Sequence, residues 1–303
     1  MKRKKSNKDV SSILLSRTKS EKVLYAFVFV LFSLYALSMI FSILFLIKNS
    51  FMEMLEYNRM QNPLALPKQW KFENYFEALT SMSTTTPSGY NVGLILMFFN
   101  SVFYCVVRML GTVLMSAFTG YIMAKYKFKA SGFIFTLAIF SMTMPVIGAS
   151  GSTFKLLTSL GLYNNPFFTV VTSLGGFGFN FLVMFGVFKG ISWNYAEAVF
   201  IDGGNHFTAF FKIMLPQAYM PMLTLCIMSF IGDWNDYMTV LMYLPDYPTL
   251  STGLYSISKS VKRSGDYPTY FAGLVIATIP ILIIFASCSE VIMKNFSIGG
   301  LKG

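Results

Sequence analysis

Residues 193–216 have the sequence WNYAEAVFIDGGNHFTAFFKIMLP, and this stretch decides how the rest of the chain is interpreted. Apolar side chains recur with helical spacing on both sides of Gly203 and Gly204, which together predict a break in the helix. Asn205 then provides a suitable N-cap for a second helix. The stretch therefore predicts two short amphipathic helices that meet at an angle. The apolar positions are Trp193, Ala196 and Phe200 in the first helix and Phe207, Phe210, Phe211 and Met214 in the second.

The surrounding composition is that of an integral membrane protein. Of the 303 residues, 54% are hydrophobic and 12% are charged, whereas soluble domains average about 45–50% and about 25%. A soluble domain of this size needs more polar surface, and a disordered or disulfide-rich chain has a different composition. The three cysteines have no C-x-x-C spacing, and the chain has one histidine, so we expect no metal site.

Six apolar stretches are long enough to cross a bilayer as helices. Residues 24–47 carry no charge, and at about 1.5 Å per residue they exceed a hydrocarbon core of about 30 Å. This first span is too long for a cleaved signal peptide, so we expect a retained anchor. Prolines at positions 145 and 280 are expected to kink two spans. The predicted spans are residues 24–47, 101–124, 131–154, 167–188, 221–244 and 268–289.

The distribution of lysine and arginine predicts the orientation in the membrane. One set of connections, with both termini, holds 15 of these residues and the opposite set holds 8, which places both termini in the cytoplasm. The basic N-terminus adjoins a span, so we expect it to contact the membrane and not nucleic acid. The predicted organisation is a basic cytoplasmic N-terminus (1–23), a first transmembrane helix (24–47), an extracellular loop (48–100), a five-helix core (101–292) and a cytoplasmic tail (293–303).

The stretch at residues 193–216 resembles the EAA loop of membrane subunits of binding-protein-dependent ABC importers. The family pattern is Glu-Ala-Ala, three residues to Asp-Gly-Ala, and then a Phe, an Ile and Leu-Pro. Val199 and Gly204 stand where the family usually has alanine. We call residues 193–216 the EAA segment from here on. The matching residues are Glu197, Ala198, Asp202, Gly203, Phe210, Ile213, Leu215 and Pro216.

The resemblance extends over most of the chain and includes its glycine-rich end. Gly299-Gly300-Leu301-Lys302-Gly303 resembles the tail of the carbohydrate branch, especially that of the shorter maltose-type permease subunit. Other similar positions are Asn100-Ser101, Tyr121, Met144-Pro145, Gly161-Leu162-Tyr163-Asn164 and Trp234-Asn235-Asp236.

The resemblance implies an all-α integral membrane fold, the type I ABC importer transmembrane domain, with six transmembrane helices and a cytoplasmic helix-turn-helix coupling loop. In that family two permease subunits form one pathway, here expected as a heterodimer in the bacterial cytoplasmic membrane. Two ATPase subunits each receive an EAA loop, and an extracellular solute-binding protein or lipoprotein delivers the solute. The residues expected to couple to the ATPase are Glu197, Ala198, Asp202, Gly203, Gly204, His206, Phe210 and Pro216.

The resemblance also implies a permease subunit for carbohydrate, expected to be oligosaccharide, and not an enzyme. The sequence has no G-x-x-x-x-G-K-[ST] phosphate loop, so ATP and Mg²⁺ are expected on the partner ATPase and no cofactor in this chain. His206 has no evident nucleophile or metal beside it, so we expect it to contact the ATPase and expect no catalytic residue. Without the resemblance, the EAA segment also fits an interfacial helix on lipid headgroups.

A polar cluster inside the predicted fifth span is the main candidate for solute contact. Charges at membrane depth usually face a cavity or a partner, and Arg108 is available to pair with Asp233 or Asp236. The same cluster also fits a purely structural network between helices, and Asn180 in the fourth span is a further pathway candidate. The candidate pathway residues are Asn180, Asp233, Trp234, Asn235, Asp236 and Tyr237.

Two alternatives keep these observations but change the function. The same fold could import a non-sugar solute such as phosphate, an amino acid or a metal chelate. A membrane-embedded transferase could use the Asp233-x-x-Asp236 pair, although that pair lies within a span and the rival does not explain the EAA pattern.

Overall fold

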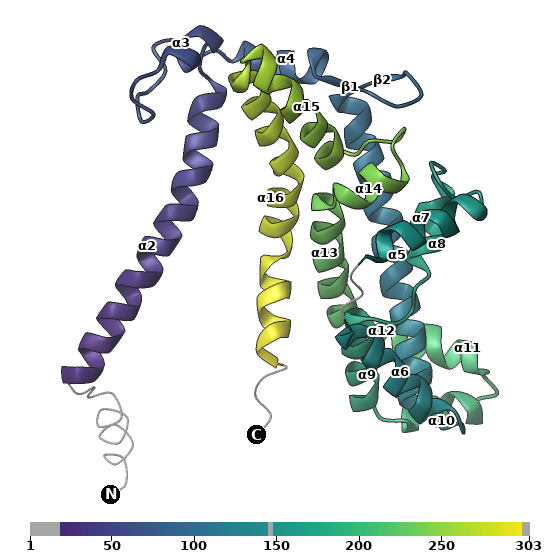
Figure 1. Ribbon diagram of the computed structural model, residues 1–303. Helices are drawn as coiled ribbons and strands as arrows, with labels where there is room; N and C mark the ends of the chain where they lie inside the picture. Colours follow the sequence, from purple (N-terminus) through teal and green to yellow (C-terminus); the bar gives the residue numbers. More distant parts are fainter. Residues whose placement is uncertain (1–18, 145–147, 299–303) are drawn as a thin grey trace, which may run out of the picture.

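The protein is described by a computed structural model that covers residues 19–144 and 148–298, with side chains up to residue 289. Within these residues the regular structure is helical except for one short antiparallel hairpin, β1 (Ser83–Thr85) paired with β2 (Asn91–Gly93). Three described helices are long and apolar enough to cross a membrane: α2 (Lys19–Ser50), α5 (Leu94–Lys125) and α16 (Tyr267–Ile298). They run between the two ends of the molecule in Figure 1. The all-α membrane fold predicted from composition is confirmed.

The predicted third, fourth and fifth spans are not single continuous helices. Glycine explains the break in the fourth, because Gly178 has φ +152°, a backbone conformation that side chains disfavour. The kink predicted at Pro145 lies outside the described residues. The third span is divided into α6 (Ser131–Thr143) and α7 (Ala149–Ser159), and the fourth into α8 (Phe167–Ser173) and α9 (Phe179–Gly190); the fifth is α13 (Tyr219–Asn235) followed by α14 (Met238–Tyr243).

The end of the molecule that carries β1 and β2, here called the hairpin end, contains several short helices. α5 begins at Leu94, seven residues before the predicted span, because the apolar run continues toward the hairpin. The long loop at residues 48–100 contains α3 (Met54–Arg59) and α4 (Glu73–Ser81) in addition to the hairpin. An amphipathic helix, α15 (Leu250–Ser264), fills most of the connection between α14 and α16. These elements cap the ends of α5, α13 and α16 (Figure 1).

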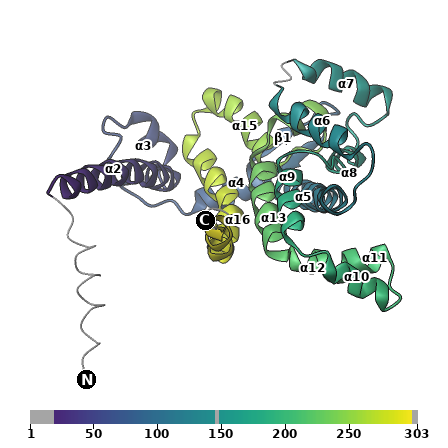
Figure 2. The ribbon, with the colours of Figure 1, turned by 90° about the horizontal axis from the view of Figure 1, so that it is seen from below.

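The opposite end, here called the EAA end, carries the EAA segment as a separate arm. The arm projects from the helices in Figure 2, and its helical run His206–Gln217 meets α13 at an angle of 75°. Its elements are α10 (Asn194–Ile201), α11 (His206–Thr208), the π-helix η1 (Ala209–Met214) and α12 (Leu215–Gln217).

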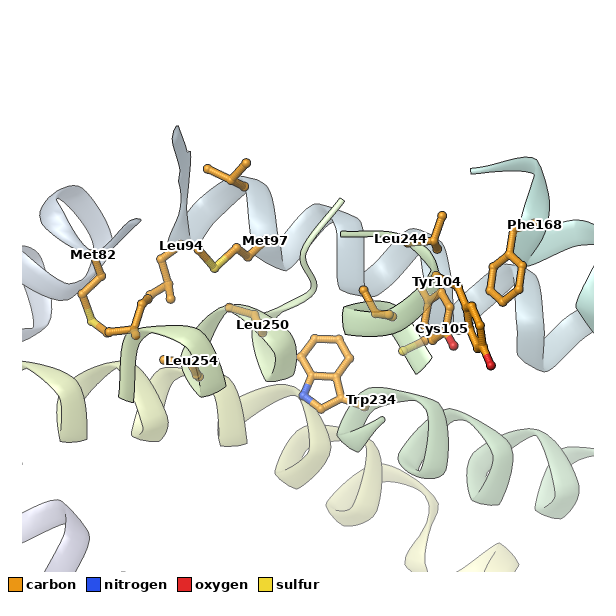
Figure 3. Close-up of a cluster of buried hydrophobic side chains, with 14 of the residues drawn as sticks. Met82, Leu94, Met97, Tyr104, Cys105, Phe168, Trp234, Leu244, Leu250 and Leu254 are labelled. Carbon is orange, nitrogen blue, oxygen red and sulfur yellow. The ribbon is translucent and has the colours of Figure 1, made fainter. Parts of the chain in front are cut away.

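Buried apolar side chains form two clusters that share α5 and α13. The first lies at the hairpin end and includes Met97, Trp234 and Leu250 (Figure 3). The second lies at the EAA end around Tyr121. Between α5 and α9 the helices approach closely at Gly120, where a Cβ atom would lie 2.9 Å from the Phe185 backbone nitrogen. Such a small residue permits the tight packing on which helix association in lipid depends.

Helix α2 stands apart from both clusters. None of its apolar window is buried within the chain, and both ribbon views separate most of it from α16 (Figures 1 and 2). It is attached at the hairpin end, where Asn74 Nδ2 donates hydrogen bonds of 2.8 Å to the carbonyl oxygens of Ser50 and Met52. The Ser50 and Tyr75 hydroxyls are also 2.7 Å apart.

Candidate functional site

The turn of the EAA segment has the geometry that its glycines and asparagine predict. The Gly204 amide donates to the Val199 carbonyl at 2.8 Å, and Gly203 has φ +79°, which glycine adopts without strain. Asn205 Oδ1 then accepts the Thr208 amide at 2.8 Å and the Thr208 hydroxyl at 3.0 Å. The predicted glycine break and the predicted N-cap are therefore confirmed.

The buried face of the EAA segment is fixed by Phe210, which is 4% exposed. Its ring centre lies 4.9 Å from that of Tyr121, 5.6 Å from that of Phe118 and 6.2 Å from that of Phe188. Phe210 belongs to the π-helix η1, in which the Leu215 amide donates to the Phe210 carbonyl five residues back. This aromatic contact joins the EAA segment to α5 and α9.

The other face of the EAA segment is exposed. The predicted coupling residues Glu197, Ala198, Asp202 and Pro216 all lie on it. Ile201, next to Asp202 in the sequence, is 86% exposed, whereas Phe207, which is 66% exposed, borders the same cavity as Phe210. The segment is therefore anchored on one face and open to a partner on the other.

His206 lies against the anchored side of the segment. Its Nδ1 is 2.8 Å from the Tyr126 hydroxyl, and its ring centre is 4.8 Å from that of Phe200. It borders a shallow cavity of about 240 Å³ whose other lining residues are aromatic or aliphatic. No group of His, Cys, Asp or Glu in the described parts of the chain is arranged to hold a metal ion. The observed role of His206 is to hold α11 against the connection that follows α5.

The predicted pairing of Arg108 is confirmed. Arg108 Nε lies 2.8 Å from Asp233 Oδ1, and Arg108 Nη1 donates to the Thr172 hydroxyl at 3.2 Å. The Tyr104 hydroxyl lies 3.4 Å from Asp236 Oδ2, and the guanidinium lies over the Tyr104 ring. The pair is largely buried, so removing one partner would leave an uncompensated charge at low dielectric. It ties α5 to α13.

The five residues of the predicted polar cluster face different ways, because α13 ends at Asn235. Trp234 is 4% exposed and its indole N–H donates to the Ala277 carbonyl at 3.1 Å (Figure 3). Asp236 Oδ1 accepts the Thr239 amide at 3.0 Å and so caps α14. Asn235 is exposed, and Tyr237 stacks on Tyr255 with ring centres 4.7 Å apart. Trp234 is therefore a packing residue.

Asn180, the remaining pathway candidate, joins two helices. Its Nδ2 donates to the Ser229 hydroxyl at 3.2 Å, which connects α9 to α13. No described hydrogen bond joins Asn180 to Arg108 or to the partners of Arg108. The candidate pathway residue Asn180 therefore lies apart from the Arg108 network.

A group of polar side chains around Asp246 at the hairpin end, here called the clamp, was not predicted from the sequence. The Asp246 carboxylate accepts the Ser88 amide at 3.1 Å, the Ser88 hydroxyl at 2.5 Å and Asn164 Nδ2 at 2.5 Å. In return the Asp246 amide donates to Asn164 Oδ1 at 3.0 Å. Asn164 has φ +53°, a conformation that asparagine tolerates better than most residues. Hydrogen bonds from Ser88 and Asn164 lower the pKa of Asp246.

Comparison with known proteins identifies the class that this fold and this segment define. Residues 116–297 match the family model described as "Binding-protein-dependent transport system inner membrane component", and the chain belongs to that family. It is therefore a multi-pass permease subunit of the inner membrane and not an enzyme.

The named relatives are permeases of similar length. The chain is 27% identical over 246 residues to the diacetylchitobiose uptake system permease protein NgcG of Streptomyces coelicolor, which covers 80% of this chain and 78% of that protein. It is 28% identical over 290 residues to AmyC of Thermoanaerobacterium thermosulfurigenes, a probable starch degradation products transport system permease protein (93% and 97%). A crystal structure of a bacterial ABC transporter involved in alginate import matches with a TM-score of 0.74 at 20% identity, over 90% of this chain and 98% of that chain. That match supports the type I permease fold.

Proposed function

We propose that this chain is one permease subunit of an ATP-driven importer for carbohydrate, with oligosaccharide as the cargo. The named relatives support the cargo, because they include permeases for diacetylchitobiose, starch degradation products and galactooligosaccharides. We infer that the EAA end and both termini face the cytoplasm and that residues 48–100 lie outside, in agreement with the distribution of lysine and arginine. A second permease subunit would complete the pathway.

The observation that carries the proposal is the two-faced geometry of the EAA segment. Its exposed face, with Glu197 and Asp202, would enter a cleft of a cytoplasmic ATPase subunit, and a basic residue there could pair with Glu197. Movement of that subunit would be transmitted through the Phe210 contacts to α5 and α9, and through the 75° bend to α13. ATP and Mg²⁺ would be bound by the ATPase subunits, and a binding protein would deliver the sugar at the hairpin end.

The geometry does not favour the transferase alternative. A D-x-x-D catalytic pair needs two carboxylates that are available to the same metal or substrate. Here Asp233 is paired with Arg108 and Asp236 caps α14. The described contacts therefore assign both carboxylates to structural interactions.

Two variants of the EAA segment test the proposal in the complex of this chain with its paired permease, ATPase and binding protein. Gly203→Pro cannot adopt φ +79°, and Glu197→Lys reverses the charge of the exposed face. Both proteins should insert in the membrane but lose the ATPase on purification, or lose its stimulation by loaded binding protein. Lys262→Ala, an exposed change at the hairpin end, is the control.

The cargo is tested by the same stimulation assay with oligosaccharides, phosphate and amino acids. Stimulation by an oligosaccharide alone would support the carbohydrate proposal. Wild-type coupling in both EAA variants would refute the coupling role, and stimulation only by phosphate or an amino acid would refute the cargo.

A further inference from the structure

A groove of about 320 Å³ lies between the end of α13, one face of α15 and the adjoining face of α16. Its volume is at the lower end of the range of about 300–1,000 Å³ that small-molecule sites occupy. In Figure 1, α15 lies above the end of α13 and α16 runs beside both, and Figure 3 shows Trp234 at their junction. The lining residues with polar groups besides Trp234 are Asn235, Ser251, Tyr255, Ser258, Tyr270 and Thr278.

None of the residues that line this groove is charged. The two carboxylates nearest in sequence, Asp233 and Asp236, are not part of the lining and are held by Arg108 and by the α14 N-terminus. Lys259 Nζ lies 4.5 Å from the centre of the Tyr255 ring, but Lys259 does not line the groove either. A ligand carboxylate in the groove would therefore lose water without gaining a cation, which is unfavourable.

Two hydroxyls of the groove have their protons engaged by backbone carbonyls, and Ser258 also forms a side-chain hydrogen bond with Tyr270 of the lining. Ser258 Oγ donates to the Tyr255 carbonyl at 2.6 Å, and Thr278 Oγ1 donates to the Val275 carbonyl at 2.7 Å. A hydroxyl whose proton is engaged in this way keeps its lone pairs for a donor. Asn235 Nδ2 likewise donates to the Ile231 carbonyl, and within the described part of the chain its Oδ1 accepts no hydrogen bond. The chemical complement is a neutral molecule with several hydroxyl donors.

The lining also includes four aliphatic side chains, Leu254, Leu274, Ala277 and Ile281, so the polar groups are the feature that separates a sugar from lipid here. Polar side chains at membrane depth are expensive when they face hydrocarbon, and they usually face a protein interior or a water-filled cavity. The Tyr255 ring is also held in place by its stack on Tyr237, with ring centres 4.7 Å apart and planes at 29°. A fixed ring edge beside several acceptors is a preorganised surface, which lowers the entropic cost of binding.

We propose that this groove is a contact site for one sugar unit of an uncharged oligosaccharide on its way through the permease, and that it disfavours uronic acid units. The proposal rests on the carbohydrate import proposed above and restricts it to neutral cargo. It assigns solute contact to Asn235 and Ser258, with Trp234 as part of the lining, and removes it from Asp233 and Asp236.

The first experiment uses the whole complex in proteoliposomes with maltotriose, galactotriose, arabinotriose, diacetylchitobiose and trigalacturonate as probes. We expect uptake of at least one neutral probe and no uptake of trigalacturonate. Uptake of trigalacturonate at a comparable rate would overturn the neutral restriction while leaving the carbohydrate proposal intact. Failure of every sugar to be taken up, with uptake of another solute class, would refute the carbohydrate proposal itself.

A matched pair of serines on α15 tests the location. Ser258 lines the groove and Ser256 does not, yet both are partly buried and both donate to a backbone carbonyl of their own helix. Ser258→Ala should slow uptake of the neutral probe about fivefold, the equivalent of one lost hydrogen bond, while Ser256→Ala should have little effect. Equal uptake by the two variants would overturn the assignment.

A labelling measurement decides the question even if Ser258→Ala assembles poorly. Ser258→Cys, in a chain whose natural cysteines at 105, 226 and 288 are replaced, should react with a water-soluble thiosulfonate reagent in the complex. Binding protein loaded with the neutral sugar should slow that reaction about fivefold. An unreactive cysteine would mean that the partner permease fills the groove, and an unchanged rate would mean that no sugar enters it; either result overturns the proposal.

Discussion

Gly204→Ala should destabilise the turn of the EAA segment, and Val199→Ala should largely relieve that effect. A Cβ atom at position 204 would lie 2.5 Å from Val199 Cγ1 and 2.9 Å from the Val199 carbonyl oxygen. The methyl contact is about 1 Å shorter than ordinary van der Waals contact, and a valine on a helix has little rotamer freedom with which to move away. The two residues that depart from the family pattern are therefore complementary in size.

The magnitudes follow from these contacts. Overpacking by one methyl group costs about 1–3 kcal/mol, so we expect about 2 kcal/mol for Gly204→Ala. Val199→Ala removes part of a half-buried side chain at a cost of about 1 kcal/mol. In the double variant the methyl clash is absent, but the 2.9 Å approach to the carbonyl adds about 0.5 kcal/mol to the cost of Val199→Ala, so we expect it to lie about 1.5 kcal/mol below the natural protein. The coupling energy is then about 1.5 kcal/mol.

Hydrogen exchange of the assembled complex measures these values locally. The amide at position 204 donates to the Val199 carbonyl, so its protection reports the opening of the turn. Gly204→Ala should lower that protection roughly thirtyfold, and adding Val199→Ala, which alone lowers it about fivefold, should reduce the loss to about twelvefold. If the two single effects add within about 0.5 kcal/mol, the two sites do not interact and the size argument is wrong.

Three further predictions concern other parts of the chain. Arg108→Met should leave the Asp233 charge unpaired at a cost of about 3–5 kcal/mol, which gel filtration should show as a loss of monodisperse protein. Adding Asp233→Leu should restore the yield of monodisperse protein. A normal yield from the single variant would contradict the role of the pair. A cysteine placed at Gln69 should be labelled from outside intact cells and one at Asn205 should not, whereas external labelling of both would contradict the proposed orientation. Because its folded pKa is lowered, Asp246 should stabilise the clamp fully above its ordinary pKa of about 4 and lose that effect as the pH falls through the lowered value. Hydrogen exchange at residues 86–90 should therefore rise in acid, and Asp246→Asn should remove this pH dependence; a flat profile in the natural chain would count against the clamp.

Features that depend on neighbours in sequence were predictable. The glycine turn and the Asn205 cap are local, since each involves contacts within five residues. The pairing of Arg108 with Asp233 joins residues 125 positions apart, but it was also predictable, because few charges lie in the predicted spans and each one needs a partner. The same reasoning could not choose between Asp233 and Asp236.

Features that depend on where helices end were not predictable from hydropathy. An apolar window counts side chains and does not register that the backbone breaks at Gly178 or that α13 ends at Asn235. Within α13, Trp234 faces the core and Asn235 is exposed, because adjacent side chains of a helix point about 100° apart. The clamp could not be predicted for another reason. Asp246 binds Ser88, which lies 158 positions away in the sequence, and neither local sequence indicates the other residue.

The isolation of α2 has a consequence for the order of assembly. α2 is stable as a helix in the bilayer, because an apolar helix forms its backbone hydrogen bonds internally and needs no packing against the rest of the chain. At the hairpin end α2 is attached through Asn74, which binds the carbonyls of Ser50 and Met52, and α2 also contacts α16. Among the described residues, neither buried cluster draws its core residues from α2. α2 can therefore form in the bilayer independently of both clusters, and covering its apolar sides with lipid or another protein needs no change in either one.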